Sequence, residues 1–187
     1  QGERTGEGIF RSASGSKYTG QFVDGQRSGQ GTFVWKNGDI YVGSWKDDLQ
    51  NGRGKLTKKN GDIFEGEFKK GYVDGNVVIH YANGNRFKGV YHNGKREGFC
   101  IEENKDGKRF EGNYKKDARD GRFVEKDRNG QVTAKGVYEN ESDLGLNFRQ
   151  ELIIIQSGGN YPLIRFYAFL KYKLKKVEIN HKIQYTM

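Results

Sequence analysis

The sequence is poor in the residues that most often carry chemistry or cross-link a small fold. Its 187 residues include one cysteine, one proline, one methionine and three histidines. A single cysteine excludes an internal disulfide framework and suits a reducing compartment. The histidines, His80, His92 and His181, have neither the HExxH nor the Cys/His spacing of a zinc site. We therefore expect no metal site, no cofactor and no catalytic residue, and Cys100 is interpreted as a packed thiol.

Long apolar runs are also missing. Hydrophobic residues make up 33% of the chain, and no apolar run approaches the roughly 18 residues that a bilayer-crossing helix needs. No secretory signal peptide opens the sequence. The chain begins with glutamine rather than methionine, so we expect a fragment or a processed form. These features favour a cytoplasmic protein with a thin core.

The charge is mixed rather than of one sign. The formal net charge is +9, but lysines such as Lys69 and Lys70 alternate with acids such as Asp47 and Asp48. A solvated rim is the ordinary interpretation, and an acidic partner or an anionic membrane is the alternative. We expect no specific nucleic-acid binding, because the rings that could stack on bases are needed for packing.

Glycine is the residue that the sequence has in excess. Three columns of glycines start at Gly6, Gly15 and Gly20 and recur every 23 residues, the third ending one residue late at Gly136. A fixed period of this length indicates an array of short units, here six, rather than a mixed globular domain.

Each unit has the pattern of a β-hairpin. The second glycine column lies mostly in Asn-Gly or Asp-Gly pairs such as Asn37-Gly38, which predict type I′ hairpin tips. An aromatic-x-Gly-x-aromatic stretch follows most tips, and alternation along a strand places both rings and the glycine on one face. The predicted fold is all-β, an elongated twisted antiparallel sheet of tandem hairpins.

The units resemble the MORN repeat. Tyr41-Val42-Gly43-Ser44-Trp45, followed by Gly52-Arg53-Gly54, is a close match, and the resemblance covers residues 1–141. Further along, the second glycine of the later pair is replaced by Val77, Cys100 and Phe123, which we interpret as decay toward terminal, capping repeats.

The resemblance implies a non-catalytic structural scaffold that assembles other proteins, in the cytoplasm at the cytoskeleton or in a cilium (axoneme). The alternatives are a membrane-apposition module that binds anionic phospholipids and an accessory region of a larger enzyme. Homo-oligomerisation is left open. We expect the rings to stay partly accessible and to bind partners. The candidates are Trp35, Tyr41, Trp45, Phe64, Phe68, Phe87, Tyr91, Phe110 and Tyr114.

Residues 142–187 form a separate, basic and apolar segment. Residues 152–155 are expected to form a strand, and the apolar residues after Pro162 fall at helical spacing opposite a basic side. The segment is interpreted as a cap over the end of the sheet, with docking to another protein or to an anionic membrane as alternatives. The docking candidates are Leu163, Phe166, Leu170, Lys171, Lys173, Lys175 and Lys176.

Overall fold

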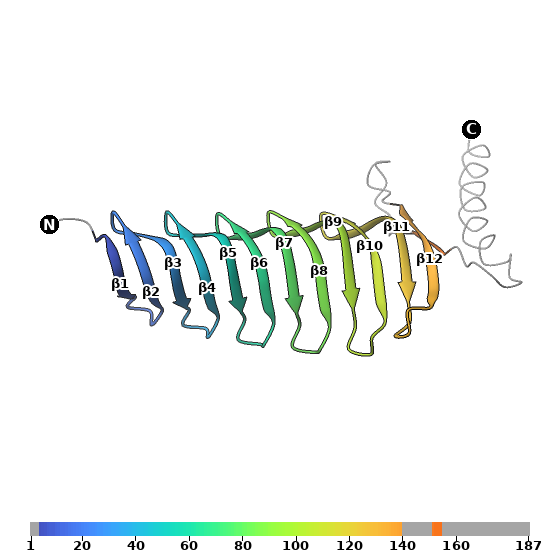
Figure 1. Ribbon diagram of the computed structural model, residues 1–187, viewed down its shortest axis with the longest axis horizontal. Coiled ribbons are helices and arrows are strands. Elements are labelled where there is room, and N and C mark those ends of the chain that lie inside the picture. The colour runs from blue at the N-terminus through green and yellow to red at the C-terminus, as the bar shows by residue number, and fades with distance from the viewer. Residues whose placement is uncertain (1–3, 140–150, 155–187) are drawn as a thin grey trace, which may run out of the picture.

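The structure is a computed structural model that describes residues 4–139 and 151–154. These residues form one open antiparallel sheet of 13 strands, whose order in space is their order in the sequence. Figure 1 shows the strands side by side in an elongated array, with turns alternating between its two long sides. The predicted all-β array of tandem hairpins is therefore confirmed.

The strands repeat a short and a long element in each unit. They are β1 (Gly6–Arg11), β2 (Lys17–Val23), β3 (Gln26–Val34), β4 (Ile40–Lys46), β5 (Leu49–Thr57), β6 (Ile63–Lys69), β7 (Tyr72–His80), β8 (Arg86–His92), β9 (Lys95–Glu103), β10 (Arg109–Lys115), β11 (Ala118–Lys126), β12 (Val132–Glu139) and β13 (Glu151–Ile154). Within β2–β11, seven-residue strands carry the aromatic-x-Gly-x-aromatic stretch and nine-residue strands carry the paired-glycine column. Each strand pairs only with its sequence neighbours, as expected of a repeat array.

Two kinds of turn alternate along the array. Asp24-Gly25 and Lys70-Gly71 are two-residue turns with positive φ at both positions, which is the type I′ geometry. At Asn37-Gly38 only the glycine has positive φ, 93°. The Trp35 amide donates to the Asp39 carbonyl, 2.9 Å away, so residues 36–38 form a three-residue loop, within which the Gly38 amide donates to the Trp35 carbonyl, 2.9 Å away. The prediction of type I′ turns at the Asn-Gly pairs is therefore wrong.

The asparagine side chain gives the physical reason. Asn37 Oδ1 accepts the amide of Asp39, 3.0 Å away, so the side chain closes its own local turn and only glycine takes the left-handed conformation. Asp39 Oδ1 in turn accepts the amide of Lys59 in the next loop, 2.9 Å away. In three other pairs of successive loops, a side-chain oxygen likewise accepts the backbone amide of the next loop: Ser16 from Lys36, Asp62 from Ala82 and Asn85 from Lys105.

A bulge bends every unit at the same place. In the first complete pair, Gly20 faces Gly31 but Phe22 faces Arg27, so residues 28–30 lie opposite a single residue. Gly29 has positive φ, 70°, at this bulge. Related register shifts recur between β4 and β5, β6 and β7, β8 and β9, and β10 and β11. Because bulges bend a strand and increase its twist, the sheet bends along a line that crosses all units.

The core lies on one face of this single layer, which we call the aromatic face. Its most buried side chains include Tyr18, Tyr41, Ile79, Phe87 and Cys100. The opposite, polar face carries mixed charges such as the ion pair Lys55–Glu65. A one-layer sheet thus obtains its core by covering glycines with rings on one side.

The C-terminal end of the array is extended by one further strand. β13 pairs antiparallel with β12, with Tyr138 opposite Leu152. The strand expected over residues 152–155 is confirmed as Glu151–Ile154. The helix expected after Pro162 and the tail-docking candidates lie outside the described residues, and the boundary at residue 141 stays a prediction.

Candidate protein-binding face

The nine ring candidates divide into a buried and a partly exposed set. All lie on the aromatic face or at its margin, where buried and partly buried hydrophobic residues form two clusters. The buried rings are Tyr41, Trp45, Phe68, Phe87, Phe110 and Tyr114. Trp35, Phe64 and Tyr91 are partly exposed. The expectation that Tyr41 and Trp45 stay accessible is wrong, because neighbouring rings cover them: Tyr41 is 0% and Trp45 5% exposed.

In the N-terminal region, strands β2–β5, a tyrosine ring lies over the glycine of the neighbouring strand. A Cβ at Gly31 would lie 2.3 Å from the hydroxyl oxygen of Tyr18, so only glycine fits beneath this ring. Likewise, a Cβ at Gly54 would lie 2.2 Å from the hydroxyl oxygen of Tyr41. The Tyr18 hydroxyl donates to the carbonyl of Gln21, 2.9 Å away. In both units the tyrosine ring therefore fills the space that a side chain at the glycine would occupy.

These rings also pack edge to face. Trp45 stands between Tyr18 and Tyr41, with ring centroids 5.3 Å away on each side and interplanar angles of 80° and 89°. Such T-shaped pairs add to the stability that burial supplies. Burial raises the pKa of the Tyr41 phenol to about 12. The phenol therefore stays protonated near neutral pH and donates to the carbonyl of Ser44, 3.1 Å away.

The side chain of Arg27 packs against this group of rings. The guanidinium carbon of Arg27 lies 4.7 Å from the Trp45 ring centroid and 5.0 Å from that of Phe33. The same group donates from Nε to Asp48 Oδ1, 2.8 Å away, in the next type I′ turn. Burial opposes ionisation of Asp48, but the hydrogen bonds and charge of Arg27 outweigh it and lower the pKa of that carboxyl. Arg27 therefore links two successive units.

In the C-terminal region, strands β8–β12, the first ring of β8 and of β10 is phenylalanine, and the glycine of the following strand is replaced. Phe87 and Phe110 occupy the places of Tyr18 and Tyr41, and Cys100 and Phe123 occupy those of Gly31 and Gly54. The rings of Phe110 and Phe123 stack with centroids 5.9 Å apart and an interplanar angle of 17°. A ring without a hydroxyl leaves room for the facing side chain. The glycine replacements at Cys100 and Phe123 thus follow units whose first ring is phenylalanine rather than tyrosine.

Charged side chains enter the aromatic face in this same region. Glu102 stands in the column that holds Phe33, Leu56 and Ile79 in earlier units. Its carboxylate accepts hydrogen bonds from the Tyr114 hydroxyl at 2.8 Å, from Arg119 Nη2 at 2.9 Å and from Arg96 Nη1 at 3.2 Å. Arg119 also donates from Nη1 to the Tyr138 hydroxyl, 2.9 Å away. We call these five residues the Glu102 network.

Tyr114 and the arginines keep fixed protonation states within the network. Burial raises the pKa of Tyr114 to about 12, and its hydrogen bond to Glu102 adds to the increase. Burial disfavours the charged form of Arg119, but its hydrogen bonds to Tyr114, Tyr138 and Glu102 outweigh this and raise its pKa. Arg119 therefore stays a cation, held 3.8 Å from the Phe110 ring centroid.

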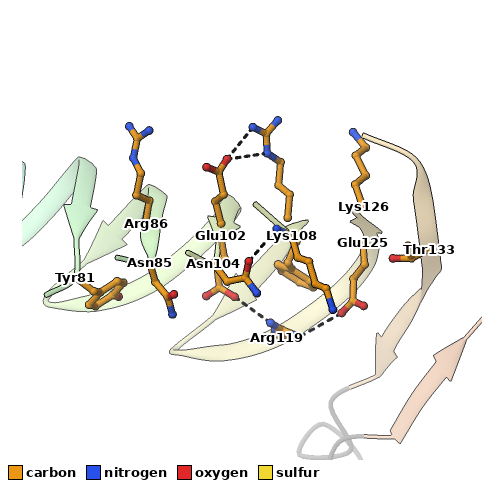
Figure 2. Close-up of a pocket in the computed structure, with 13 residues that line it drawn as sticks. Tyr81, Asn85, Arg86, Glu102, Asn104, Lys108, Arg119, Glu125, Lys126 and Thr133 are labelled. Atoms are coloured by element: carbon orange, nitrogen blue, oxygen red, sulfur yellow. Dashed lines mark hydrogen bonds and ion pairs between the residues drawn. The ribbon is translucent and has the colours of Figure 1, made fainter. Parts of the chain in front are cut away.

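A hollow of about 370 Å³ lies beside the network. Figure 2 shows Arg119 between Glu102 and Glu125, while Arg86 and Lys126 extend in the opposite direction. The hollow is also lined by Tyr81, Asn85, Asn104, Lys108 and Phe110. It therefore offers a ring, an amide and exposed charges to a polar or charged side chain of a partner.

A reactive thiol needs a lowered pKa and exposure, and a metal site needs several ligating side chains together. Burial raises the pKa of the Cys100 thiol to about 12, and the side chain is 1% exposed, so it is a packed thiol as predicted. Within residues 4–139 and 151–154, no group of three histidine, cysteine or acidic side chains could hold a metal ion. Nor do those residues contain a helix that is long and apolar enough to cross a membrane.

Sequence reasoning missed the charged members of this face. Arg27, Arg96, Glu102 and Arg119 were not among the candidates, although each occupies a fixed place in the 23-residue period. Comparing the same place between units, rather than seeking the consensus within each, would have shown acids replacing apolar residues at Glu102 and Glu125. That change in one column is the signal for a polar site on an otherwise apolar face.

The comparisons with known proteins agree with this repeat architecture. The family model for the MORN repeat matches residues 1–17, 18–40, 41–63, 64–86 and 87–109. The chain therefore belongs to the MORN repeat family. The structure continues the same hairpin geometry beyond the matched residues, through β10–β12.

No curated protein matches the chain. Among solved structures, it is similar to the TCP domain of SAS-4 (dCPAP) of Drosophila melanogaster, in complex with a proline-rich motif of Ana2 (dSTIL). The sequence identity is 16%, the match covers 78% of this chain and 88% of that one, and the TM-score is 0.35.

Proposed function

We propose that the chain is a non-catalytic scaffold that binds other proteins along its aromatic face, within a cytoskeletal or ciliary assembly. The observation that supports the aromatic face is the partial exposure of Trp35, Phe64 and Tyr91, which pack against the clusters of buried rings. Large aromatic side chains held rigidly in this way are common anchors of protein interfaces. Membership of the MORN family supports a scaffold, because a repeat array presents one surface many times.

The two regions of the face suit different side chains of a partner. Near the N-terminal region, Trp35 packs on Phe33 with ring centroids 4.7 Å apart and leaves part of its indole open. In the C-terminal region, the side chain of Glu125 is 42% exposed beside Arg119. An extended segment could thus place apolar side chains on Trp35 and hydrogen-bonding side chains in the hollow.

The test is proximity labelling in the cells from which the protein comes, with matched aromatic substitutions on the two faces. Trp35→Ser removes an anchor on the aromatic face, and Phe99→Ser removes a 55% exposed ring from the polar face. We expect Trp35→Ser to lose labelled neighbours by about tenfold, the effect of an interface residue that contributes about 1.4 kcal/mol. Phe99→Ser should keep them. The reverse pattern would place binding on the polar face.

Trp45→Ala is not a suitable test of binding, because Trp45 is 5% exposed and its loss would act through the fold.

Two further results would change the proposal. Labelled neighbours outside the cytoskeleton and cilium would contradict the localisation. Salt-sensitive flotation with phosphatidylserine vesicles that is lost when Lys171, Lys173, Lys175 and Lys176 become glutamine would favour the membrane alternative.

A further inference from the structure

Glu125 is an acid of the aromatic face that has fewer donors than its counterpart one unit earlier. Glu102 accepts three hydrogen bonds of 2.8 to 3.2 Å, from Tyr114, Arg119 and Arg96. Among residues 4–139 and 151–154, Glu125 accepts no hydrogen bond, and its ionic contact is with Arg119 Nη1, 3.9 Å away. The Glu125 side chain is 42% exposed and that of Glu102 is 25% exposed. The Glu125 carboxylate can therefore accept a further cation.

The register of the last strands gives the reason for this difference. Arg119 stands opposite Tyr114, and from there its Nη2 reaches the Glu102 carboxylate. One unit later, the position opposite Tyr138 holds Leu152, and leucine has no hydrogen-bond donor in its side chain. The repeat therefore provides the acid of this unit without the arginine that would neutralise it.

The two sides of the sheet differ in charge at this place. Figure 2 shows the Glu125 side chain directed to the same side as Tyr81 and Arg119, whereas Lys126 extends in the opposite direction. On that opposite, polar face, facing residues of β8–β11 form a row that runs through Arg86, Glu103, Arg109 and Lys126. A basic group is repelled by this row and attracted to Glu125, so charge selects the aromatic face for it.

We propose that residues 163–176 of this chain, which we call the basic segment, dock in the hollow of the aromatic face with a lysine on Glu125. The basic segment contains no acid, and its five cations are Arg165, Lys171, Lys173, Lys175 and Lys176. Its apolar side chains suit the half-buried ring of Tyr81, which also lines the hollow. These apolar residues are Leu163, Phe166 and Leu170.

The basic segment is tethered close to the hollow. Ile154 ends β13, which is two strands from β11, the strand of Glu125. Neighbouring strands lie about 4.8 Å apart, so about 10 Å separates β13 from β11. The 16 residues between Ile154 and Lys171 would span about 55 Å if fully extended, which is more than the reach required. The tether gives an effective concentration on the order of millimolar, so a weak contact suffices.

The docked basic segment would cover the polar end of the surface to which we assign partner binding. A partner that reaches the hollow must displace the segment, which therefore lowers the apparent affinity of the array for partners. This competition rests on the proposed function, whereas the contact between the basic segment and Glu125 does not.

The first test is cross-linking of the full chain with a carbodiimide, which joins a carboxylate to a lysine amine only where the two are in contact. Equal amounts of isotope-labelled and unlabelled protein distinguish links within a copy from links between copies. We expect links within one copy from Glu125 to Lys171, Lys173, Lys175 or Lys176.

The positive control for this experiment is the pair Glu111 and Lys126, whose charged atoms lie 2.8 Å apart on the polar face. A control link without any link from Glu125 to the basic segment would overturn the proposal. Links from Glu125 that form only between copies would also overturn it, because the occupant would then be a second copy. Links from the lysines to Glu103 or Glu111 instead would place the segment on the polar face.

Limited proteolysis with trypsin measures the docking without a cross-linker. Glu125→Gln removes the charge and keeps the size of the side chain, and Glu111→Gln makes the same change on the polar face. We expect cleavage after the lysines of the basic segment to be about threefold faster in Glu125→Gln than in the parent. Glu111→Gln should match the parent, and circular dichroism checks that both variants are folded. Equal rates in Glu125→Gln and the parent would contradict the contact.

An exchange of charges tests the pairing directly. Glu125→Lys alone places a cation against the basic segment and should leave no link from position 125 to it. The same variant with Lys171, Lys173, Lys175 and Lys176 changed to glutamate should regain the link, because the charges are again opposite. Failure of the combined variant to regain the link would show that the segment does not dock by its charge on position 125.

Proximity labelling separates this contact from the proposed function. Changing Lys171, Lys173, Lys175 and Lys176 to glutamine should release the basic segment and increase the labelled neighbours by about threefold. A decrease would contradict the competition. If the Glu125 links form but Trp35→Ser keeps its neighbours, the contact stands and the proposed function is wrong. If Trp35→Ser loses its neighbours but no Glu125 link forms, the function stands and the contact is wrong.

Discussion

The two ends of the array use the same hairpin but stabilise it with different chemistry. In the N-terminal region the hydroxyl belongs to the first ring of each unit, Tyr18 or Tyr41, and bonds to the backbone beyond a glycine. In the C-terminal region it belongs to the second ring, Tyr114 or Tyr138, and bonds within the Glu102 network. The intervening β6 has phenylalanine at both places, Phe64 and Phe68.

The comparison shows that the residue at one position of the 23-residue repeat can change only together with the residues that it contacts. Tyr18 requires glycine at position 31, two residues from the Phe33 that it faces, because the phenol lies where a Cβ would be. Where the first ring is phenylalanine, the position of that glycine holds Cys100 or Phe123. The second ring of the unit can then carry the hydroxyl. Once Tyr114 presents that hydroxyl, a carboxylate such as Glu102 is a better neighbour than leucine.

The largest effect should come from placing a residue of a later unit in the N-terminal region. Gly54→Val copies Val77 of the next unit, but its Cβ would lie 2.2 Å from the Tyr41 hydroxyl oxygen and 2.4 Å from its Cζ. We expect a loss of about 3 kcal/mol in the free energy of unfolding, measured by urea denaturation.

The double variant Tyr41→Phe/Gly54→Val should recover at least about 1 kcal/mol of this loss, because the ring is no longer held by the Ser44 carbonyl. If the two substitutions are additive, the exchange between regions is not compensatory.

A smaller effect is expected from the opposite exchange. Glu102→Leu copies Leu56, and it leaves Arg96, Arg119 and the Tyr114 hydroxyl without their shared acceptor. We expect a loss of about 2 kcal/mol in the free energy of unfolding.

Adding Arg96→Gln and Arg119→Val, which copy Gln50 and Val73, should restore most of the stability lost in Glu102→Leu. Thermal denaturation followed by circular dichroism would compare the three proteins. A triple variant that is less stable than Glu102→Leu would show that the network contributes more than its replacement by apolar packing.

The third prediction concerns pH and the loops on one long side. Asp39 is 6% exposed, and the hydrogen bond from Lys58, with that from the Lys59 amide, lowers its pKa. A lowered folded-state pKa stabilises the fold above the unfolded value and loses this contribution as pH falls through the folded value. We expect Asp39→Asn to cost about 1 kcal/mol at pH 7 and to reduce the loss of stability below about pH 4.

Asn85 occupies the same place in the C-terminal region and also accepts the amide of the next loop, Lys105, at 3.1 Å. An asparagine does not ionise, so Asn85→Asp should add acid sensitivity where there was none. Equal acid sensitivity of the parent and Asp39→Asn, by denaturation at several pH values, would show that Asp39 ionisation is not coupled to folding.

The smallest effects are expected on the polar face. The Lys55 and Glu65 side chains are 50% and 48% exposed, whereas those of Lys126 and Glu111 are 29% and 21% exposed. Lys55→Ala should change the free energy of unfolding by less than about 0.5 kcal/mol. Lys126→Ala should cost about 1 kcal/mol, because its pair is better shielded from water. A larger effect for Lys55→Ala would contradict the ranking by exposure.

Much of this fold could be predicted, because a period is a property of the sequence itself. Each aromatic-x-Gly-x-aromatic stretch gives a strand with both rings on one side, as Tyr41 and Trp45 show. The turn types could not be assigned in this way, since Asn-Gly suits both a two-residue and a three-residue loop. The Asn37 side chain and the strand register decide between them.

The candidate site was predicted only in part for a related reason. The ring positions follow from the repeat, but exposure depends on which neighbouring ring covers which, and Trp45 is covered from both sides. The Glu102 network joins side chains from β9, β10, β11 and β12 that are up to 42 residues apart, Arg96 to Tyr138. No pattern within one short stretch of the sequence predicts such a cluster.

The sequence by itself determined the family, the hairpin unit and the face on which the rings lie, because these depend on spacing and on the two-residue alternation of a strand. The tertiary structure alone decided which rings stay exposed, which turns close each unit and where charges meet on the aromatic face. Those features depend on the bulge and register between neighbouring strands, which bring distant side chains within bonding distance.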